Sequence, residues 1–364
     1  MTKRAKSILL LIVAFLILLS IFCVILFSGK GKDDKVKIGF IMTGAVGESG
    51  WNGMHYNGVK TACEKLGGEL LVRENIPEFT GACNGAIREL AEDGAKMIIL
   101  SSYGYSEEAK ELVKQYPQIV FYVNSSEYHD ENMTSYFARM YQARYLAGMV
   151  AGMKSESDTI GYVAAMENNE VNRGINAFTL GVKRVNPDAQ VLVNWTGEWD
   201  YEAKEKEAAQ QLIGAGADVL TYHQNRPNVV AAAEEAGIYS IGYHAAAEGA
   251  SGKHLTAVVC DWGMVYEEII REYMIGKGNL QDNYWIGMEA QAVGLSELSS
   301  EVTAEIRDEL AQAKQELLTG KDVFSGVIYD NAGKLRCGEK EVISDEMLLE
   351  QFDWYVEGVR FYER

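Results

Sequence analysis

The sequence predicts an α/β protein made of two doubly wound, Rossmann-like lobes that follow an apolar N-terminal helix. Three observations predict this architecture. Short β-forming runs alternate with amphipathic helical runs, the alternation starts again after a helix at 141–153, and 364 residues are enough for two ordinary domains. With 48% hydrophobic and 24% charged residues, the composition is that of a globular protein rather than a disordered one.

The first element is an apolar segment at residues 8–27, which carries no charged side chain. A helix of this length, rising about 1.5 Å per residue, spans about 30 Å, the thickness of the hydrocarbon core of a bilayer. Basic residues precede the segment, so the positive-inside rule places the N-terminus in the cytoplasm. We therefore expect residues 1–30 to be a signal or transmembrane anchor in the cell membrane, with the binding domain extracytoplasmic. A cleaved signal or a lipoprotein built on Cys23 is the alternative, although Phe22 stands where a lipobox has a small residue.

The next elements form the first lobe. Hydrophobic, β-forming runs predict four strands, and the runs between them have apolar residues at helical spacing with a Gly or Pro stop. The predicted strands are residues 35–42, 69–75, 96–102 and 119–124. Because helices alternate with these strands, the sheet should be parallel and covered by helices on both faces.

The same order of elements recurs in a second lobe. Its predicted strands are residues 159–166, 189–195, 217–223 and 238–244. The rest of the chain adds a β-forming run at 255–262 and helices near 263–277, 302–319 and 344–359. We expect lobe 1 to comprise residues 36–140 plus part of 258–300, and lobe 2 to comprise 141–257 plus part of 300–364.

The loops after these strands predict the ligand site, because open α/β sheets bind ligands beyond the carboxyl ends of their strands. In the first lobe the loops read GESGWN, SSYGY and NSSEY, and in the second lobe NWTGEW, YHQNRP and GYHAA. Aromatic rings supply stacking area and amides supply hydrogen-bond donors and acceptors, while charged residues are few. These loops therefore predict a planar, uncharged ligand that forms hydrogen bonds.

The charge balance limits the possible partners. The chain has 34 Lys and Arg against 52 Asp and Glu. Four of the basic residues lie at or before residue 30, which leaves 30 basic against 52 acidic residues in the exported part, a formal charge of −22. So acidic a surface repels nucleic acid and anionic lipid headgroups, and it disfavours a polyanionic ligand.

Motifs for catalysis or metal binding are missing from the sequence. We find no G-x-S-x-G, H-E-x-x-H, P-loop or strand-linked G-x-G-x-x-G motif, which predicts a protein without enzymatic activity. The cysteines beyond the apolar segment have no C-x-x-C spacing, so we expect no structural zinc, no cofactor, and free, buried thiols. These cysteines are Cys63, Cys83, Cys260 and Cys337.

Several longer motifs make the chain similar to a known family. They include GWNGMHYNG, ARMYQARYLAGMVAG, NRGINAFTLGVKRVNPDA and EQFDWYVEGV. Over about residues 36–360 the chain resembles the basic membrane protein (BMP) family of extracytoplasmic solute-binding proteins, the purine-nucleoside-receptor-like group that serves ABC importers. The resemblance implies a type I periplasmic-binding-protein fold, in which lobes joined by three hinge crossovers close on a ligand without chemistry. It also implies an ABC permease as partner.

The resemblance implies roles for four residues. Trp51 and Asn52, in a glycine-rich turn, match the phenylalanine and asparagine of the family's first loop, where the ring stacks on a purine and the amide contacts its edge. Asn124 corresponds to an aspartate that reads the base edge, and Trp199 matches the second stacking ring. The alternative for Trp51 is a loop residue packed on its own lobe, and the alternative for Trp199 is a lid over the core.

Three departures from the family pattern concern the groups that serve the ribose of a nucleoside. Gly47 and Glu48 stand at the positions of an acidic pair, and Ala246 at the position of an aspartate. The later lysine is absent, and residues 260–263 stand near its place. The departures favour a free purine base, such as adenine or hypoxanthine, over a purine nucleoside.

Further aromatic and polar side chains complete the expected ligand site. They are Tyr103, His223, Tyr243, His244, Asp261 and Trp262. Three of them have an ordinary structural alternative: the two histidines can bond within their loops, and Asp261 can cap a helix. For Trp262, which stands at a predicted helix start after a strand, contact with the ligand and no contact stay equally open. We expect His55 to be structural and Trp195 to lie in the core.

Together these features predict a membrane-anchored receptor that hands a purine base or nucleoside to an ABC importer. Two other hypotheses stay open. The anchor would also suit a sensory ectodomain that reports the ligand to a partner membrane protein, and the aromatic loops would also suit another flat heterocycle, such as a flavin.

Overall fold

The computed structural model describes residues 35–48, 50–125, 128–244, 249–276, 280 and 283–362. The expected anchor and Cys23 lie outside the described residues, and so does Ala246. Within the described part, no helix is both long enough and apolar enough to cross a membrane. The anchor therefore stays a prediction.

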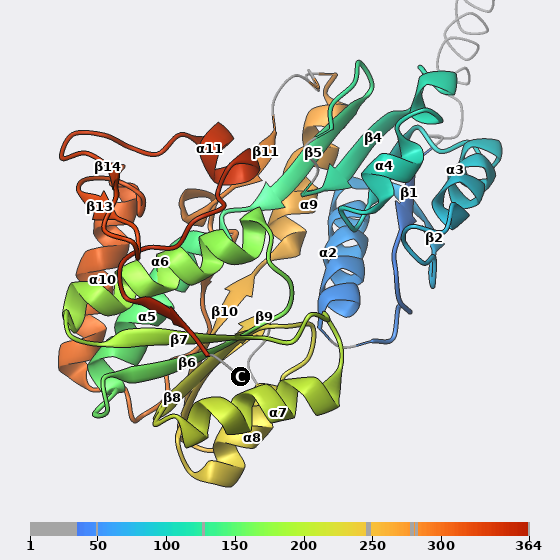
Figure 1. Cartoon of the computed structure of the whole chain (residues 1–364). Coiled ribbons are helices and arrows are strands. Elements are labelled where there is room, and N and C mark those ends of the chain that lie inside the picture. The colour runs from blue at the N-terminus through green and yellow to red at the C-terminus, as the bar shows by residue number, and fades with distance from the viewer. Residues whose placement is uncertain are drawn as a thin grey trace, which may run out of the picture.

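The first sheet has six strands, and every pair of neighbours in it is parallel. In spatial order the strands are β11 (Tyr284–Ile286), β5 (Met133–Ala138), β4 (Val120–Asn124), β3 (Met97–Leu100), β1 (Lys37–Ile41) and β2 (Glu69–Arg73). The helices of this half are α2 (Trp51–Leu66), α3 (Ala82–Glu92), α4 (Tyr105–Ala109) and α9 (Trp262–Met274). In Figure 1 this half lies to the upper right.

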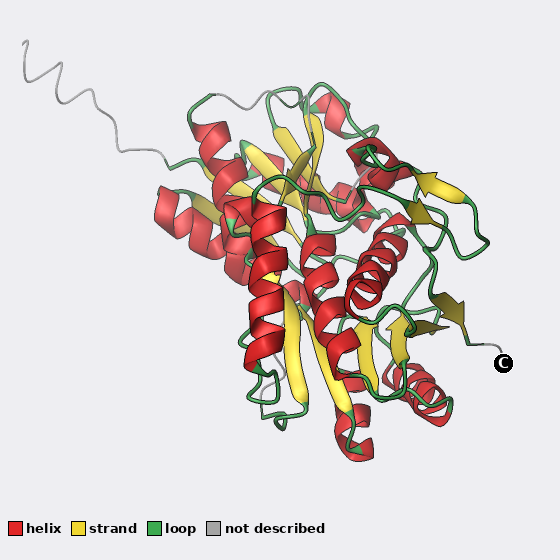
Figure 2. Ribbon diagram, turned by 90° about the vertical axis from the view of Figure 1, so that its left-hand side faces the viewer, coloured by secondary structure: helices red, strands yellow, loops and turns green. Residues whose placement is uncertain are grey.

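The second sheet has seven strands and is parallel except for the pairing of β10 with β12. In spatial order the strands are β12 (Val293–Leu295), β10 (His254–Cys260), β9 (Tyr239–His244), β8 (Val219–His223), β6 (Thr159–Ala164), β7 (Gln190–Trp195) and β15 (Val359–Phe361). Its helices include α5 (Met140–Lys154), α6 (Asn169–Val185), α7 (Glu202–Gly214) and α8 (Asn228–Ala236). Figure 2 shows helices flanking the strands of both halves. The predicted α/β class with parallel sheets is therefore confirmed.

The chain passes between the two halves three times. It leaves the first sheet after β5 and enters α5, which packs against α6 and β10 of the second half. It returns after β10 into α9, which packs against α2. It then passes from β11, at the edge of the first sheet, to β12, at the edge of the second. The residue boundaries of the two lobes stay a prediction.

Helices α5 and α6 of the second half pack closely against each other. A Cβ atom at Gly148 of α5 would collide with the backbone carbonyl of Phe178 in α6, and one at Gly181 of α6 would collide with that of Tyr145 in α5. Glycines at both contact points therefore allow the two helix backbones to touch. The side chain of Asn168 accepts a hydrogen bond from the N–H of Val171 at 2.9 Å and caps α6.

The C-terminal part contains α10 (Ala304–Leu318), β13 (Ile328–Tyr329), β14 (Leu335–Cys337) and α11 (Asp345–Glu350). The predicted helix at 344–359 is wrong beyond Glu350, because the following backbone is bound by two asparagines of α6. Asn172 donates to the carbonyl of Phe352 at 3.0 Å, and Asn176 both donates to the carbonyl of Trp354 and accepts from the N–H of Val356. These bonds replace helical ones, and the chain goes on into β15.

Two other expectations need correction. Residues 133–138 form β5, which was not predicted, and Trp51 begins α2 rather than lying in a turn. Gly50, with φ 78°, supplies the left-handed backbone that precedes this helix.

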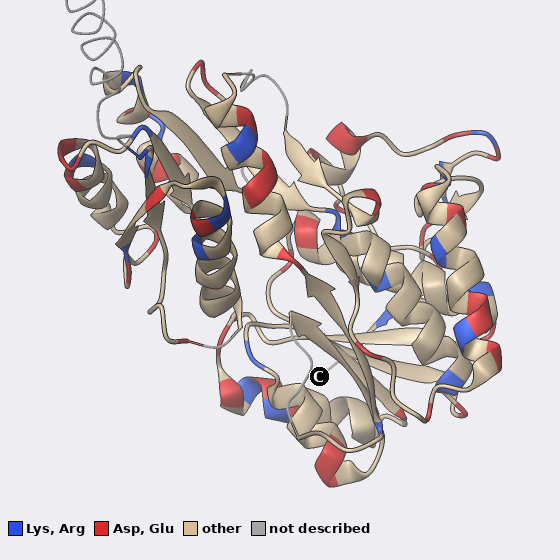
Figure 3. Ribbon diagram, turned by 180° about the vertical axis from the view of Figure 1, so that it is seen from behind, with Lys and Arg blue, Asp and Glu red and all other residues tan. Residues whose placement is uncertain are grey.

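The four cysteines beyond the apolar segment are free and buried, as expected. In Figure 3, which colours the ribbon by residue type, acidic residues are spread over both halves, with basic residues between them.

Candidate ligand-binding cavity

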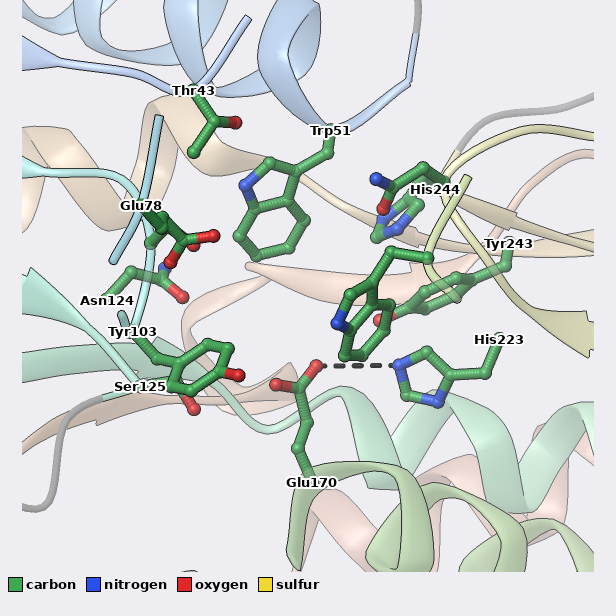
Figure 4. A pocket seen from close by; sticks show the side chains of 13 residues that line it. Thr43, Trp51, Glu78, Tyr103, Asn124, Ser125, Glu170, His223, Tyr243 and His244 are labelled. Atoms are coloured by element: carbon green, nitrogen blue, oxygen red, sulfur yellow. Dashed lines mark ion pairs between the residues drawn. The ribbon is translucent and has the colours of Figure 1, made fainter. Parts of the chain in front are cut away.

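A cavity of about 130 Å³ lies between the two halves (Figure 4). The first half lines it with Thr43, Trp51, Glu78, Ser102, Tyr103, Asn124 and Ser125, and the second half with Glu170, Trp199, His223, Asn225, Tyr243 and His244. Each of these residues ends a parallel strand or lies in the segment that follows one. The cavity therefore occupies the position where open α/β sheets hold their ligands.

Trp51 forms one aromatic wall of the cavity. Its indole N–H donates to the carbonyl of Ser101 at 3.2 Å, and its ring lies 4.1 Å, between centroids, from the ring of His55. The ring of His244, from the second half, meets it edge-on at 5.5 Å. The indole is thus fixed by its own half and touches the other half.

Trp199 contributes the second indole, from the loop after β7. Its ring lies edge-on to His223 at a centroid distance of 6.0 Å, and its carbonyl accepts the N–H of Asn225 at 3.0 Å. The His223 ring in turn meets Tyr243 at 4.6 Å, and Tyr243 stands 3.7 Å from His244. The second half therefore presents a continuous run of rings to the cavity.

The two cavity histidines are neutral. Burial, with Arg144 acting in the same direction, lowers the pKa of His223 to about 4. Burial also lowers the pKa of His244 well below its ordinary value. Among the described residues their buried Nδ1 atoms have no hydrogen-bond partner. A neutral imidazole can donate or accept, so both rings suit an uncharged heterocycle.

Arg144 of α5 lies behind this wall and is 1% exposed. Its guanidinium carbon stands 3.9 Å from the centre of the Tyr243 ring, and its Nη1 donates to the carbonyl of Tyr222 at 2.9 Å. A buried cation over an aromatic face is favourable, and it also disfavours a second positive charge nearby. Arg144 therefore adds to the effect of burial in lowering the pKa of His223, and it packs against the ring of Tyr243.

Two carboxylates lie on opposite walls. Glu170, in the first turn of α6, stands 3.4 Å from Nε2 of His223. Glu78 accepts the N–H of Gly104 at 2.8 Å, and burial raises its pKa, although hydrogen bonds from Ser102 and Gly104 oppose the rise. Both carboxylates can accept hydrogen bonds from N–H groups of a ligand.

Seven of the ten predicted site residues line the cavity. They are Trp51, Tyr103, Asn124, Trp199, His223, Tyr243 and His244. Their contact with a ligand stays a prediction. Of these, Asn124 at the end of β4 is 2% exposed, and its buried amide nitrogen has no hydrogen-bond partner among the described residues.

Three predicted site residues lie outside the cavity lining. Asn52 accepts from the hydroxyl of Thr43 at 3.0 Å and from the N–H of Gly44 at 3.1 Å, so it orders the first loop. Asp261 caps α9 by accepting the N–H of Met264. Trp262 is 2% exposed, with its ring 3.8 Å from the ring of His55. For Asp261, the structural alternative describes the observed position.

The two residues expected to be structural behave differently. His55 is fully buried and forms a hydrogen bond with the hydroxyl of Tyr266, as a structural histidine would. Trp195 is only half-buried, and it packs against the core from the end of β7.

Sequence reasoning did not single out six lining residues. Ser102, Ser125 and Asn225 lie inside loops that were predicted to face the ligand, so only the choice of residue was missed. Glu170 looks like an ordinary acidic residue in the first turn of a helix, and Glu78 lies in the segment after β2, outside the loops predicted to face the ligand. Thr43 is the sixth. The signal in the sequence that could have identified these six residues is their position after predicted strands.

Metal binding finds no support in the described part of the chain, where no group of three or more His, Cys, Asp and Glu side chains could hold an ion. The absence of a cofactor stays a prediction.

Comparison with known proteins identifies relatives over most of the chain. The family model described as "ABC transporter substrate-binding protein PnrA-like" (Bmp) matches residues 35–322. A purine-binding protein of Brucella abortus is 31% identical over 90% of this chain and 93% of its own length. A putative ABC transporter glucose-binding protein of Haloferax volcanii is 31% identical over 91% of this chain and 82% of its own.

Solved structures share the fold. A protein from Bacillus halodurans, described as a transcriptional activator of the comK gene, superposes with a TM-score of 0.70 at 25% identity. The match covers 78% of this chain and 98% of that one. The comparisons therefore confirm the family resemblance that the motifs indicated.

Proposed function

This chain belongs to the Bmp family of PnrA-like ABC transporter substrate-binding proteins, and from that premise we propose that its cavity binds a free purine base such as adenine or hypoxanthine. In this proposal the protein works outside the cytoplasm, is held at the membrane by its N-terminal segment, and delivers the base to an ABC permease. Members of the family are solute-binding proteins, and the proposal involves no catalytic step.

One observation carries the proposal: indoles from both halves, Trp51 and Trp199, line the same cavity. Stacking on an aromatic side chain contributes about 1–3 kcal/mol per base. The remaining lining offers amides, hydroxyls, neutral imidazoles and two carboxylates, which can pair with the donors and acceptors around a purine. The Brucella abortus relative is described as a purine-binding protein, which agrees with this lining.

A free base is favoured over a nucleoside because the expected ribose groups are missing. Gly47, Glu48 and residues 260–263, which stand where the family has those groups, do not line the cavity. A base held by rings and edge contacts needs none of them.

The proposed mechanism is closure of the two halves around the base. The three chain crossings between the halves would act as the hinge, and a ligand that contacts both walls would favour the closed form. The contact between Trp51 and His244 already joins the two walls at one point. The permease would then recognise the closed form.

Isothermal titration calorimetry with a ligand panel tests the proposal. Adenine, hypoxanthine, adenosine, riboflavin and glucose are titrated into the exported part of the chain. We expect the two bases to bind most tightly. Binding of glucose without any purine would contradict the proposal and would agree instead with the description of the Haloferax volcanii relative as a putative glucose-binding protein. Tight riboflavin binding would support the alternative flat ligand.

A sensory role is the second candidate, and one specific observation favours it. The Bacillus halodurans protein of the same fold is described as a transcriptional activator. Genes beside this one distinguish the two roles: permease and ATPase genes support import, whereas a kinase or chemoreceptor gene supports sensing.

A further inference from the structure

A small chamber of about 10 Å³ lies behind the ring wall of the cavity. His223, Tyr243 and Glu170 line both spaces, whereas Arg144 lines the chamber but not the cavity. A space of this size holds about one water molecule. We propose that a water molecule in this chamber connects Arg144 to Nδ1 of His223 and fixes the proton of the neutral imidazole on Nε2, where it holds Glu170. The inference goes beyond the proposed function and does not depend on which ligand the cavity binds.

Arg144 brings two unused hydrogen-bond donors to the chamber. Its side chain is 1% exposed, and its Nη1 donates to the carbonyl of Tyr222 at 2.9 Å. The other two guanidinium nitrogens, Nε and Nη2, are buried and have no hydrogen-bond partner among the described residues. A buried donor without an acceptor is unfavourable, and a guanidinium can only donate. An acceptor atom in the chamber would therefore be stabilising.

Two further buried atoms without a hydrogen-bond partner in the described part of the chain lie at one place. They are Nδ1 of His223 and the hydroxyl oxygen of Tyr162. Gly174 of α6, which lines the chamber, locates them, because a Cβ atom there would lie 3.3 Å from Nδ1 and 3.4 Å from the hydroxyl oxygen. The guanidinium carbon of Arg144 stands 5.5 Å from the centre of the Tyr162 ring. The unpaired groups therefore converge on the space that Gly174 leaves open.

One water molecule can satisfy all of these groups. Its oxygen accepts from Arg144, one of its hydrogens goes to Nδ1 of His223, and the Tyr162 hydroxyl can either donate to it or accept from it. Buried water molecules make about three hydrogen bonds to polar groups that otherwise have no partner. The chamber thus offers a water the number and the kinds of partner that it needs.

The two sides of the His223 ring favour the same tautomer. Nε2 stands 3.4 Å from a carboxylate oxygen of Glu170 (Figure 4). A proton on Nε2 makes this contact attractive, whereas a lone pair there would repel the carboxylate. On the other side, a water held by the guanidinium of Arg144 turns a hydrogen towards Nδ1, which accepts it through its lone pair. Glu170 is thereby held as an acceptor at the cavity, and Arg144 is a positioning residue that acts on it through His223.

A small anion is the other occupant of this size that buried arginines could attract. Arg173, which also lines the chamber, is 3% exposed. An anion would, however, lie near the carboxylate of Glu170, which lines the chamber too, and it would meet the lone pair on Nδ1 of His223. Water avoids both repulsions because it can donate as well as accept, so we assign the chamber to water.

Nitrogen NMR of the full-length protein in detergent, labelled with nitrogen-15 only at histidine, tests the inference without any ligand. A long-range proton–nitrogen correlation spectrum at neutral pH distinguishes the two tautomers. The spectrum of His223→Gln identifies the signals of His223 among those of the five histidines. We expect His223 to carry its proton on Nε2, with the Nδ1 signal shifted as in a nitrogen that accepts a hydrogen bond. A proton on Nδ1, or a mixture of the two tautomers, overturns the inference.

Gly174→Ala should displace the water while keeping every side chain that forms hydrogen bonds with it. The added methyl group takes the place beside Nδ1 of His223, so the Nδ1 signal should move to that of a nitrogen without a hydrogen bond. Gly85→Ala in α3 is the matched control, because a Cβ there meets no atom within 4 Å, and it should leave the signals of His223 unchanged. An unmoved Nδ1 signal in a Gly174→Ala protein that is folded by circular dichroism overturns the inference.

The role of Arg144 is tested by rescue. Arg144→Met removes the donors that hold the water, so the Nδ1 signal of His223 should move as it does in Gly174→Ala. Arg144→Lys still donates and should keep the wild-type signal, whereas a purely structural role would make both variants disturb it alike. Replacing chloride by gluconate in the buffer should change nothing, and a shift of the His223 signals would overturn the assignment to water in favour of an anion. Should Arg144→Met fail to fold, the wild-type tautomer and Gly174→Ala still decide the question.

Discussion

At the scale of single residues, the cavity combines rigid rings with neutral polar groups. Trp51 is held by a hydrogen bond to Ser101 and by the ring of His55, so little side-chain freedom remains to be lost when a ligand stacks on it. Trp199 is similarly tied through its backbone to Asn225. Stacking surfaces fixed before binding make stacking more favourable, because the ordering cost has already been met in folding.

We expect Trp51→Ala to weaken purine binding by roughly 1–3 kcal/mol, because stacking on one indole is lost. Trp51→Phe should keep most of the affinity, since it preserves a stacking ring. Calorimetry with adenine measures both variants, and a thermal melt shows whether they fold. Unchanged affinity in a folded Trp51→Ala protein would mean that the ring does not contact the base.

Protonation of His223 should couple stability to pH. Its folded pKa of about 4 lies below the ordinary value of 6.5, so the unfolded chain takes up this proton first as the pH falls. The contribution of neutral His223 to the free energy of unfolding is therefore fully present above about pH 6.5 and is lost as the pH falls through about 4. The loss amounts to up to about 3 kcal/mol. Urea unfolding between pH 4 and 7 should show a shallower loss in His223→Gln than in wild type. If the stability of the wild type and of His223→Gln fell in parallel with pH, His223 would not be the group responsible.

At the scale of elements, strands made of regular hydrophobic runs could be predicted from the sequence, whereas strands that mix polar and apolar residues could not. Most of the strands that end at the cavity are largely buried and apolar, so their ends could be read from the sequence. β5 was missed because its buried run, MTSYFA, contains Thr134 and Ser135. The segment after Glu350 was misassigned because its backbone partners, Asn172 and Asn176, lie on a helix about 180 residues away in sequence.

The contact between α5 and α6 gives a prediction at this scale. Gly148→Ala places a methyl group against the carbonyl of Phe178, so we expect destabilisation of about 1–3 kcal/mol. Gly85→Ala in α3 is the control, because a Cβ there meets no atom within 4 Å and should be neutral or stabilising by up to about 1 kcal/mol. Urea unfolding measures both. Equal effects would show that close approach is not what requires Gly148.

At the scale of the whole molecule, the site depends on how the two halves meet. The loops of each half could be predicted separately, because each follows its own strands. The way in which the loops of the two halves come together could not be predicted. Sequence reasoning therefore did not place Glu78 and Glu170 at one cavity, and it placed Asp261 and Trp262 there although they lie outside its lining. The relative placement of two sheets is set by side-chain packing at the chain crossings, which no local pattern of residues encodes.

Closure of the halves should appear as simultaneous protection of both walls. Adding adenine should slow amide hydrogen exchange in residues 41–48 and 100–105 of the first half and in residues 222–225 and 242–244 of the second, since a bound base contacts both walls and favours the closed form. Helix α10, which contributes no residue to the cavity lining, serves as an internal control and should exchange at the same rate with and without ligand. Trp199→Ala should reduce protection in both halves together, because weaker binding lowers the population of the closed form. Protection confined to one half would instead describe a ligand held on one wall, and hinge closure would have to be abandoned even if the base binds tightly.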